Sequence, residues 1–203
     1  MNDYPKLKFF IVFTILLSIN IIYSQSNNKF KPIDIFSLEY VSNPKISPDG
    51  KKVLYVRNFK DIMTDKNHSN IWIIDFDGKN NTPLTTGNKN DFDPTWSNSG
   101  DKFTYKSNSD DTVQLYLYVL AQKSNQKLTN LQNSVSSVDW SEDDKYLVFT
   151  SFVEKPSVSL IKMPEKPKGA KWNDPASEID GIKYRSDGRG YLNQGFSQVF
   201  ILP

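Results

Sequence analysis

The chain contains the stretch Ile46-Ser47-Pro48-Asp49-Gly50-Lys51-Lys52-Val53-Leu54-Tyr55-Val56, and its pattern returns twice further along. The second copy begins at Trp96-Ser97 and the third at Trp140-Ser141. In each copy a bulky apolar residue and a serine lead into a short polar turn. A lysine and an alternating run of aromatic or branched residues then follow. This order predicts a strand, a tight turn and a second strand in every copy.

The turns of the first two copies contain a glycine, Gly50 or Gly100, whereas the third has Asp143-Asp144. Glycine adopts a positive φ without steric cost, so we expect it where the turn requires this conformation. The third copy therefore predicts a weaker turn.

The spacing of the copies indicates the fold. The serines at 47, 97 and 141 lie about 44 to 50 residues apart, a period typical of a four-stranded propeller blade. Third strands are predicted at 70–75 and 114–119, and fourth strands at 82–85 and 126–129. Four short strands per unit, repeated radially, predict an all-β fold, a β-propeller. A β-sandwich would have hairpins at similar spacing, but no reason to repeat Trp-Ser-turn-Lys in register.

We expect an incomplete propeller over residues 41–203, with blades at about 41–86 and 93–130 and an irregular third at 135–203. Trp96 and Trp140 are expected to pack between blades. The last run, 197–203, resembles a strand that begins a further hairpin, so the prediction is about three blades and the start of a fourth. A propeller needs about four to eight blades to close, and we therefore expect the N-terminal part of a longer protein.

Residues 1–24 differ from the rest of the chain. Lys6 and Lys8 precede an apolar run at 9–22, and Ser24 offers a small residue for cleavage. This pattern predicts a secretory signal peptide and an exported chain, periplasmic or secreted, with no membrane attachment after cleavage. An uncleaved anchor is the alternative. Residues 25–40 form a lead-in segment, in which 32–40 is either a short helix or an edge strand.

The composition argues against nucleic-acid binding and against sites that need cysteine. The chain has 203 residues, a formal net charge of +2 and no cysteine. A near-neutral chain without a basic stripe is a poor candidate for binding nucleic acid. The lack of cysteine excludes disulfides, thiol nucleophiles and cysteine-based zinc sites.

The sequence offers no catalytic constellation. It has no G-x-S-x-G motif, and its one histidine, His68, lies in a polar stretch at 59–69 that we interpret as a solvated loop between strands. Residues 75–80 begin like a calcium loop, but Thr86 stands where an EF-hand needs a glutamate. We therefore predict no catalytic residue, no metal site and no cofactor.

One stretch has the composition of a contact loop. Tyr184, Arg185 and Tyr191 could meet a peptide by stacking or by pairing with its carboxylate, and Gly188 and Gly190 allow close backbone approach. A structural loop between blades is the alternative.

The chain resembles the exported, propeller-bearing serine peptidases of the prolyl oligopeptidase superfamily, in the dipeptidyl-peptidase and acylaminoacyl-peptidase branches. The resemblance rests on the Ser47-Pro48-Asp49-Gly50-Lys51 repeats, together with Ala170-Lys171-Trp172, Lys183-Tyr184-Arg185, Asp187-Gly188, Gly190-Tyr191-Leu192 and Val199-Phe200. TolB-like periplasmic propellers share the first of these features.

The resemblance implies a C-terminal α/β-hydrolase domain that holds the serine, aspartate and histidine of a triad. It also implies a propeller that gates the access of peptide substrates to that domain. None of the catalytic positions exists in this sequence, and Glu154 and Glu178 stand alone rather than as a substrate-binding pair. A TolB-like protein-binding propeller without enzymatic activity is the alternative function, and a truncated gene product is another.

Overall fold

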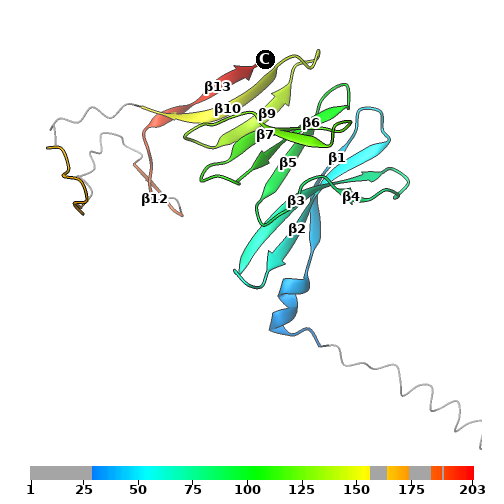
Figure 1. Ribbon diagram of the computed structural model, residues 1–203, viewed down its shortest axis with the longest axis horizontal. Helices are drawn as coiled ribbons and strands as arrows, with labels where there is room; N and C mark the ends of the chain where they lie inside the picture. Colours follow the sequence, from blue (N-terminus) through cyan, green and yellow to red (C-terminus); the bar gives the residue numbers. More distant parts are fainter. Residues whose placement is uncertain (1–28, 156–163, 174–183, 189) are drawn as a thin grey trace, which may run out of the picture. The chain divides into compact units, whose positions relative to one another are not determined.

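The computed structural model describes residues 29–155, 164–173, 184–188 and 190–203 (Figure 1). The predicted signal peptide and Glu178 lie outside the described residues. The chain divides into two units, Met1–Leu38 and Glu39–Pro203. Among the described residues, none of the helices has the length and apolar character needed to cross a membrane.

The described part of the first unit contains a short 3-10 helix, η1 (Pro32–Ser37). The proline stands where a helix start tolerates the missing N–H, and Asp34 accepts a hydrogen bond from the backbone N of Lys31 at 2.8 Å. Of the two alternatives for this segment, the helix is therefore the observed one.

The second unit contains two four-stranded antiparallel sheets of the predicted kind (Figure 1). The first has the order β1-β2-β3-β4, with β1 (Tyr40–Ile46), β2 (Lys52–Asp61), β3 (Lys66–Asp75) and β4 (Thr82–Pro83). The second has the order β5-β6-β7-β8, with β5 (Asp91–Trp96), β6 (Lys102–Ser107), β7 (Gln114–Val119) and β8 (Ser124–Lys127). The prediction of a partial all-β propeller is confirmed.

The third sheet corrects one expectation. Its order is β13-β10-β9, with β9 (Val135–Trp140), β10 (Leu147–Glu154) and β13 (Gly195–Leu202). The last run does not begin a fourth blade, because β13 pairs with β10 from Leu147 opposite Leu202 to Glu154 opposite Gly195. Alternation along a single strand cannot tell which neighbour it pairs with, and the long segment before β13 breaks the regular spacing. A separate pair, β11 (Arg185–Ser186) and β12 (Gly190–Tyr191), lies within that segment.

The polar stretch at 59–69 is not a loop. Strands β2 and β3 continue through it, pairing Phe59 with His68 and Asp61 with Lys66. Polar side chains obscure the alternation here, although the backbone ladder is unbroken. His68 is consequently on a strand and 8% exposed, which corrects the expectation of a solvated loop residue.

The fourth strands end earlier than their sequences predict. Beyond each fourth strand, a threonine side chain replaces the backbone ladder: the Oγ1 of Thr85 or Thr129 accepts a hydrogen bond from a backbone N of the third strand. The donors are Ile71 at 3.0 Å and Leu115 at 2.9 Å. The repeated Leu-Thr pair therefore closes each blade by a side-chain bond.

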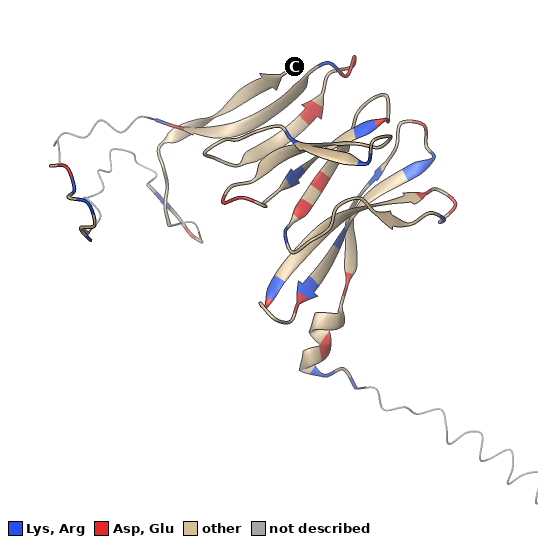
Figure 2. Ribbon diagram, viewed as in Figure 1, with Lys and Arg blue, Asp and Glu red and all other residues tan. Residues whose placement is uncertain are grey.

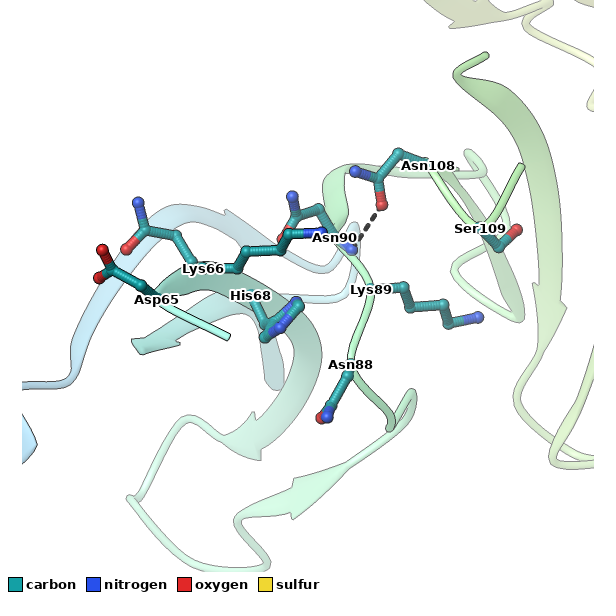
Figure 3. Close-up of a pocket in the computed structure, with 9 residues that line it drawn as sticks. Asp65, Lys66, His68, Asn88, Lys89, Asn90, Asn108 and Ser109 are labelled. Carbon is teal, nitrogen blue, oxygen red and sulfur yellow. Dashed lines mark hydrogen bonds between the residues drawn. The ribbon is translucent and has the colours of Figure 1, made fainter. Parts of the chain in front are cut away.

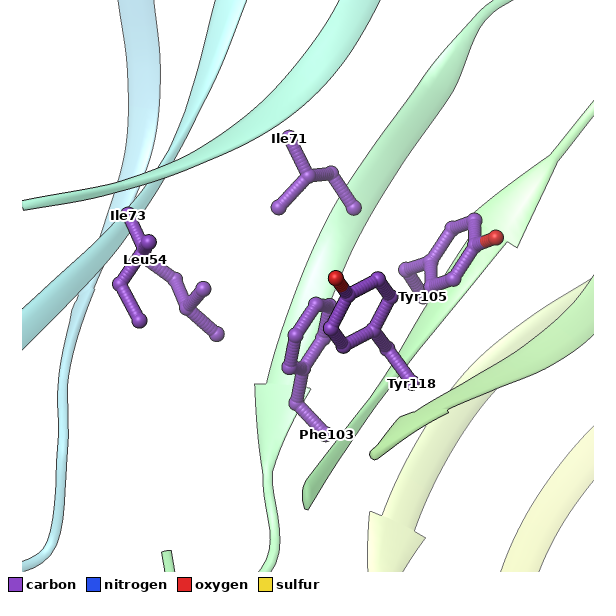
Figure 4. Packing of buried hydrophobic residues seen from close by; sticks show 6 residues of the cluster. All are labelled: Leu54, Ile71, Ile73, Phe103, Tyr105 and Tyr118. Carbon is purple, nitrogen blue, oxygen red and sulfur yellow. The ribbon is translucent and has the colours of Figure 1, made fainter. Parts of the chain in front are cut away.

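The apolar core lies between neighbouring sheets. The first two sheets share a cluster in which Leu54, Ile71 and Ile73 face Phe103, Tyr105 and Tyr118 (Figure 4). A second cluster joins the second and third sheets around Leu115, Val135, Leu147 and Phe149. Within the described residues, both apolar clusters thus lie between neighbouring sheets.

The repeated serine organises each turn. Ser47 donates its hydroxyl to Asp49 Oδ1 at 2.7 Å and accepts a hydrogen bond from the backbone N of Lys52 at 2.9 Å. Ser141 repeats both interactions in the third turn. In the second turn Ser97 instead donates its hydroxyl to the backbone O of Lys102 at 2.9 Å. In all three turns the serine hydroxyl thus bonds backbone where the ladder ends.

In the second and third blades, the tryptophan before the turn serine attaches the blade to the preceding one. Trp96 donates its indole N–H to the backbone O of Lys45 at 2.9 Å, and Trp140 donates to that of Thr95 at 3.2 Å. Both acceptors stand two residues before a turn serine, so the bond repeats at equivalent positions. The expectation that both tryptophans pack between blades is confirmed.

Neighbouring turns also meet, in two different ways. At the first junction Pro48 lies against Gly100, where a Cβ would stand 3.2 Å from the proline Cδ. At the second junction, Asp144 accepts hydrogen bonds from the backbone N of Asn98 and of Ser99, each at 2.7 Å. Burial alone would raise the pKa of Asp144, but the bonds from Ser99 and Asn98 outweigh it and lower the pKa to about 2.

Replacing Asp144 by Asn should lower the free energy of unfolding at pH 7 by about 1 kcal/mol. Asn tolerates the positive φ of 55° at this position, so the change removes mainly the charge. Since the folded-state pKa lies below the usual value of about 3.9, the contribution is present above about pH 4 and is lost as the pH falls towards about 2. Urea unfolding of the wild type and the variant at pH 7 and at pH 2 measures this difference. If the two proteins differed in free energy of unfolding by as much at pH 2 as at pH 7, the role of the carboxylate would be contradicted.

Gly195 permits the third sheet to form. A Cβ at this position would lie 2.2 Å from the backbone O of Val153 and 2.7 Å from Cζ of Phe152. One obstacle is backbone, so a larger residue forces β13 away from β10.

We expect Gly195→Ala to destabilise the chain by about 1 to 3 kcal/mol and to expose the β13 amides to hydrogen exchange. Ser197→Ala, at an exposed position of the same strand, is the matched control and should leave exchange unchanged. Wild-type protection of β13 in the glycine variant would refute the steric explanation.

Candidate functional site

The five residues of the predicted contact loop form a small hairpin. Arg185 pairs with Tyr191 across β11 and β12, and the backbone N of Leu192 donates to the O of Tyr184 at 2.8 Å. Gly188 has a φ of 73° and Gly190 one of 71°, so the turn depends on conformations that favour glycine.

The hairpin brings its two tyrosines together. The rings of Tyr184 and Tyr191 stack with centroids 6.3 Å apart and planes at 27°. They are nevertheless 48% and 69% exposed, and Arg185 beside them is exposed as well. An exposed aromatic pair next to a guanidinium can pack against a peptide and pair with a carboxylate. It supplies neither a nucleophile nor a general base.

His68 lies on β3 beside Asp61 of β2. Its Nε2 is buried without a hydrogen-bond partner and lies 3.9 Å from Oδ2 of Asp61. In the part of the chain that the structure describes, no hydrogen bond joins His68 to a serine hydroxyl. The same residues contain no group of three or more side chains that could hold a metal ion.

One buried carboxylate was not predicted from the sequence. Asp91 is fully buried, and both of its carboxylate oxygens are without a hydrogen-bond partner. Its nearest opposite charge is Nζ of Lys89, 3.7 Å from Oδ2. Burial, followed by the negative charge of Asp91, raises the pKa of Tyr105.

Comparison of the blades would have found this residue. Asp91 pairs with Ser107 at the start of its blade, and Val135 pairs with Ser151 at the start of the next. The same buried position is therefore apolar in one blade and charged in the other.

Asp91→Val should raise the free energy of unfolding at pH 7 by about 1 kcal/mol, because apolar residues often replace buried ion pairs at no loss. Lys89 is 28% exposed at its side chain and can turn to solvent. The reciprocal variant Val135→Asp should destabilise strongly, since it buries a new charge. Thermal and urea unfolding compare the two. A large loss of stability in Asp91→Val would instead mean that the carboxylate holds the junction together.

Residues 35–171 match the family PD40, TolB beta propeller domain. The chain is 30% identical over 171 residues to "Uncharacterized peptidase YuxL" of Bacillus subtilis, and 21% identical over 145 residues to "Dipeptidyl-peptidase 5" of Porphyromonas endodontalis. These matches cover 83% and 71% of this chain, but 25% and 21% of the relatives. The chain thus spans about a quarter of the length of these peptidases.

Solved structures support the fold. The acylaminoacyl peptidase in complex with Z-Gly-Gly-Phe-chloromethyl ketone matches with a TM-score of 0.60 and 17% identity, over 82% of this chain and 24% of its own. The uncomplexed acylaminoacyl peptidase of Pyrococcus horikoshii matches with a TM-score of 0.59 and 18% identity, over 83% and 23%. In fold and in sequence, this chain belongs to the TolB beta propeller domain family.

Proposed function

We propose that this chain is the N-terminal propeller portion of an exported serine peptidase, and that the propeller gates the access of peptides to a separate α/β-hydrolase domain. The observation that carries the proposal is the match to relatives named as peptidases, of which this chain spans about a quarter. The chain alone is not expected to hydrolyse peptides.

The surfaces of the end sheets are consistent with a larger propeller. Val41 and Ile46, on one face of β1, are 67% and 62% exposed, and Val199 and Ile201, on one face of β13, are 67% and 66% exposed. Apolar sheet faces of this kind are normally covered in a soluble protein, and further blades would cover them.

Export is part of the same proposal. It rests on the basic residues and apolar run within residues 1–24, which lie outside the described residues. Membership of the TolB beta propeller family is compatible with an exported protein.

The decisive experiment uses the native source. An antibody against this chain captures the protein, a fluorophosphonate labels any reactive serine, and mass spectrometry gives the intact mass. We expect a labelled species several times heavier than the 23.3 kDa of this chain. Cleavage of dipeptidyl amides by the purified chain alone would contradict the proposal.

A TolB-like propeller that binds proteins without chemistry is the second candidate, and the family match favours it. The same labelling separates the two candidates. An unlabelled species that co-purifies with a partner protein supports the binding propeller and excludes the peptidase.

The tyrosine hairpin provides a finer test in the full-length peptidase. The double variant Tyr184→Ala and Tyr191→Ala should lower kcat/KM for peptides by about tenfold, a loss of about 1.4 kcal/mol in transition-state stabilisation. Fluorophosphonate labelling should stay unchanged, because the hairpin does not touch the reactive serine in this proposal. Tyr146→Ala, at a tyrosine that is 46% exposed outside the hairpin, is the matched control. Equal kinetics in all three proteins would remove the hairpin from peptide recognition.

A further inference from the structure

A polar groove lies where three connections of the first two blades meet (Figure 3). Its volume is about 610 Å³. Every lining side chain is polar, and they comprise Asp65, Lys66, Asn67, His68, Asn88, Lys89, Asn90, Asn108 and Ser109. A groove of this composition suits a hydrated polar ligand, not an apolar one.

Hydrogen bonds within the second blade, and one from β3 to the connection after β4, hold the residues that line the groove. The backbone N of Asn90 donates to Oδ1 of Asn108 at 2.7 Å, and the N of Asn108 donates to the O of Asn90 at 3.1 Å (Figure 3). The backbone N of Ser69 donates to the O of Lys89 at 3.2 Å. Because Oδ1 of Asn108 is occupied, its amide N–H groups are left to meet a ligand.

His68 lines this groove and carries an unsatisfied nitrogen. Although the side chain is only 8% exposed, its Nε2 has no hydrogen-bond partner. Oδ2 of Asp61 is too far away at 3.9 Å, and it already accepts the hydroxyl of Thr64 at 2.7 Å. A buried nitrogen in this position costs free energy unless a ligand or water bonds to it.

The charges favour a single negative charge on the ligand. The end of the β2–β3 hairpin carries both signs (Figure 2). Lys89 is paired with Asp91, whereas Lys66 forms no ion pair within the described residues. One unpaired ammonium and several amide donors match a carboxylate, and Asp65 on the rim disfavours a dianion such as phosphate.

We propose that this groove binds a carboxylate of a peptide, at its C-terminus or on an acidic side chain. Lys66 supplies the charge, and His68 and Asn108 supply hydrogen-bond donors. The proposal stands whether or not the chain belongs to a peptidase, because no catalytic domain takes part.

The chain provides its own reporter, because His68 is the single histidine. Its imidazole proton resonance is followed at fixed pH during titration with N-acetylglycine, N-acetylaspartate amide and the neutral N-acetylglycinamide. We expect a saturable shift with one or both carboxylates and no shift with the amide. The first compound reports recognition of a C-terminus, and the second reports recognition of an acidic side chain.

Lys66→Met keeps the aliphatic stem and should weaken carboxylate binding by about tenfold. Lys51→Met is the matched control, since this lysine is 80% exposed on the first serine turn, and it should bind as the wild type does. The proposal is overturned if neither carboxylate shifts the resonance, if the neutral amide shifts it equally, or if Lys66→Met binds with unchanged affinity.

Discussion

Each sheet of this propeller depends on a neighbouring sheet to cover its face. A twisted four-stranded meander has two faces and no helix to shield either of them. The described clusters accordingly form between sheets, with Leu54 and Ile71 facing Phe103 across the first junction. The stability of a blade is therefore a property of pairs of blades, as in other repeat proteins.

Directional bonds supplement this apolar contact at the junctions. The indole of Trp96 fixes how the second blade approaches the first, and that of Trp140 does so for the third. Apolar packing alone tolerates sliding, whereas a hydrogen bond to one backbone oxygen selects a single position. This explains why tryptophan, with its large ring and its N–H, recurs immediately before the turn serine.

Much of the fold could be predicted because the repeat carries information in several copies. The hairpin around Ser97 and the strand at 114–119 were predictable from local pattern and period. The strand around His68 was not, because polar side chains on a continued ladder resemble a loop. The partner of β13 was also beyond prediction, since it depends on which sheet edge is available. The candidate loop around Tyr184 was recognisable from its composition, and Asp91 could have been found by comparison with the equivalent Val135. The unpartnered Nε2 of His68 could not, because it depends on three-dimensional contacts of the side chain.

The two kinds of turn junction have an evolutionary consequence. Pro48 has no N–H to offer a carboxylate and fills the space above Gly100, whereas Asn98 offers its N–H groups to Asp144. Exchanging one member alone would either place a side chain against the proline ring or leave donors without an acceptor. Such positions should co-vary across homologues over a separation of about one repeat, and a blade duplicated into a new place in the ring would arrive with an unsuitable neighbour. The turn residues therefore restrict the order in which the blades can follow one another.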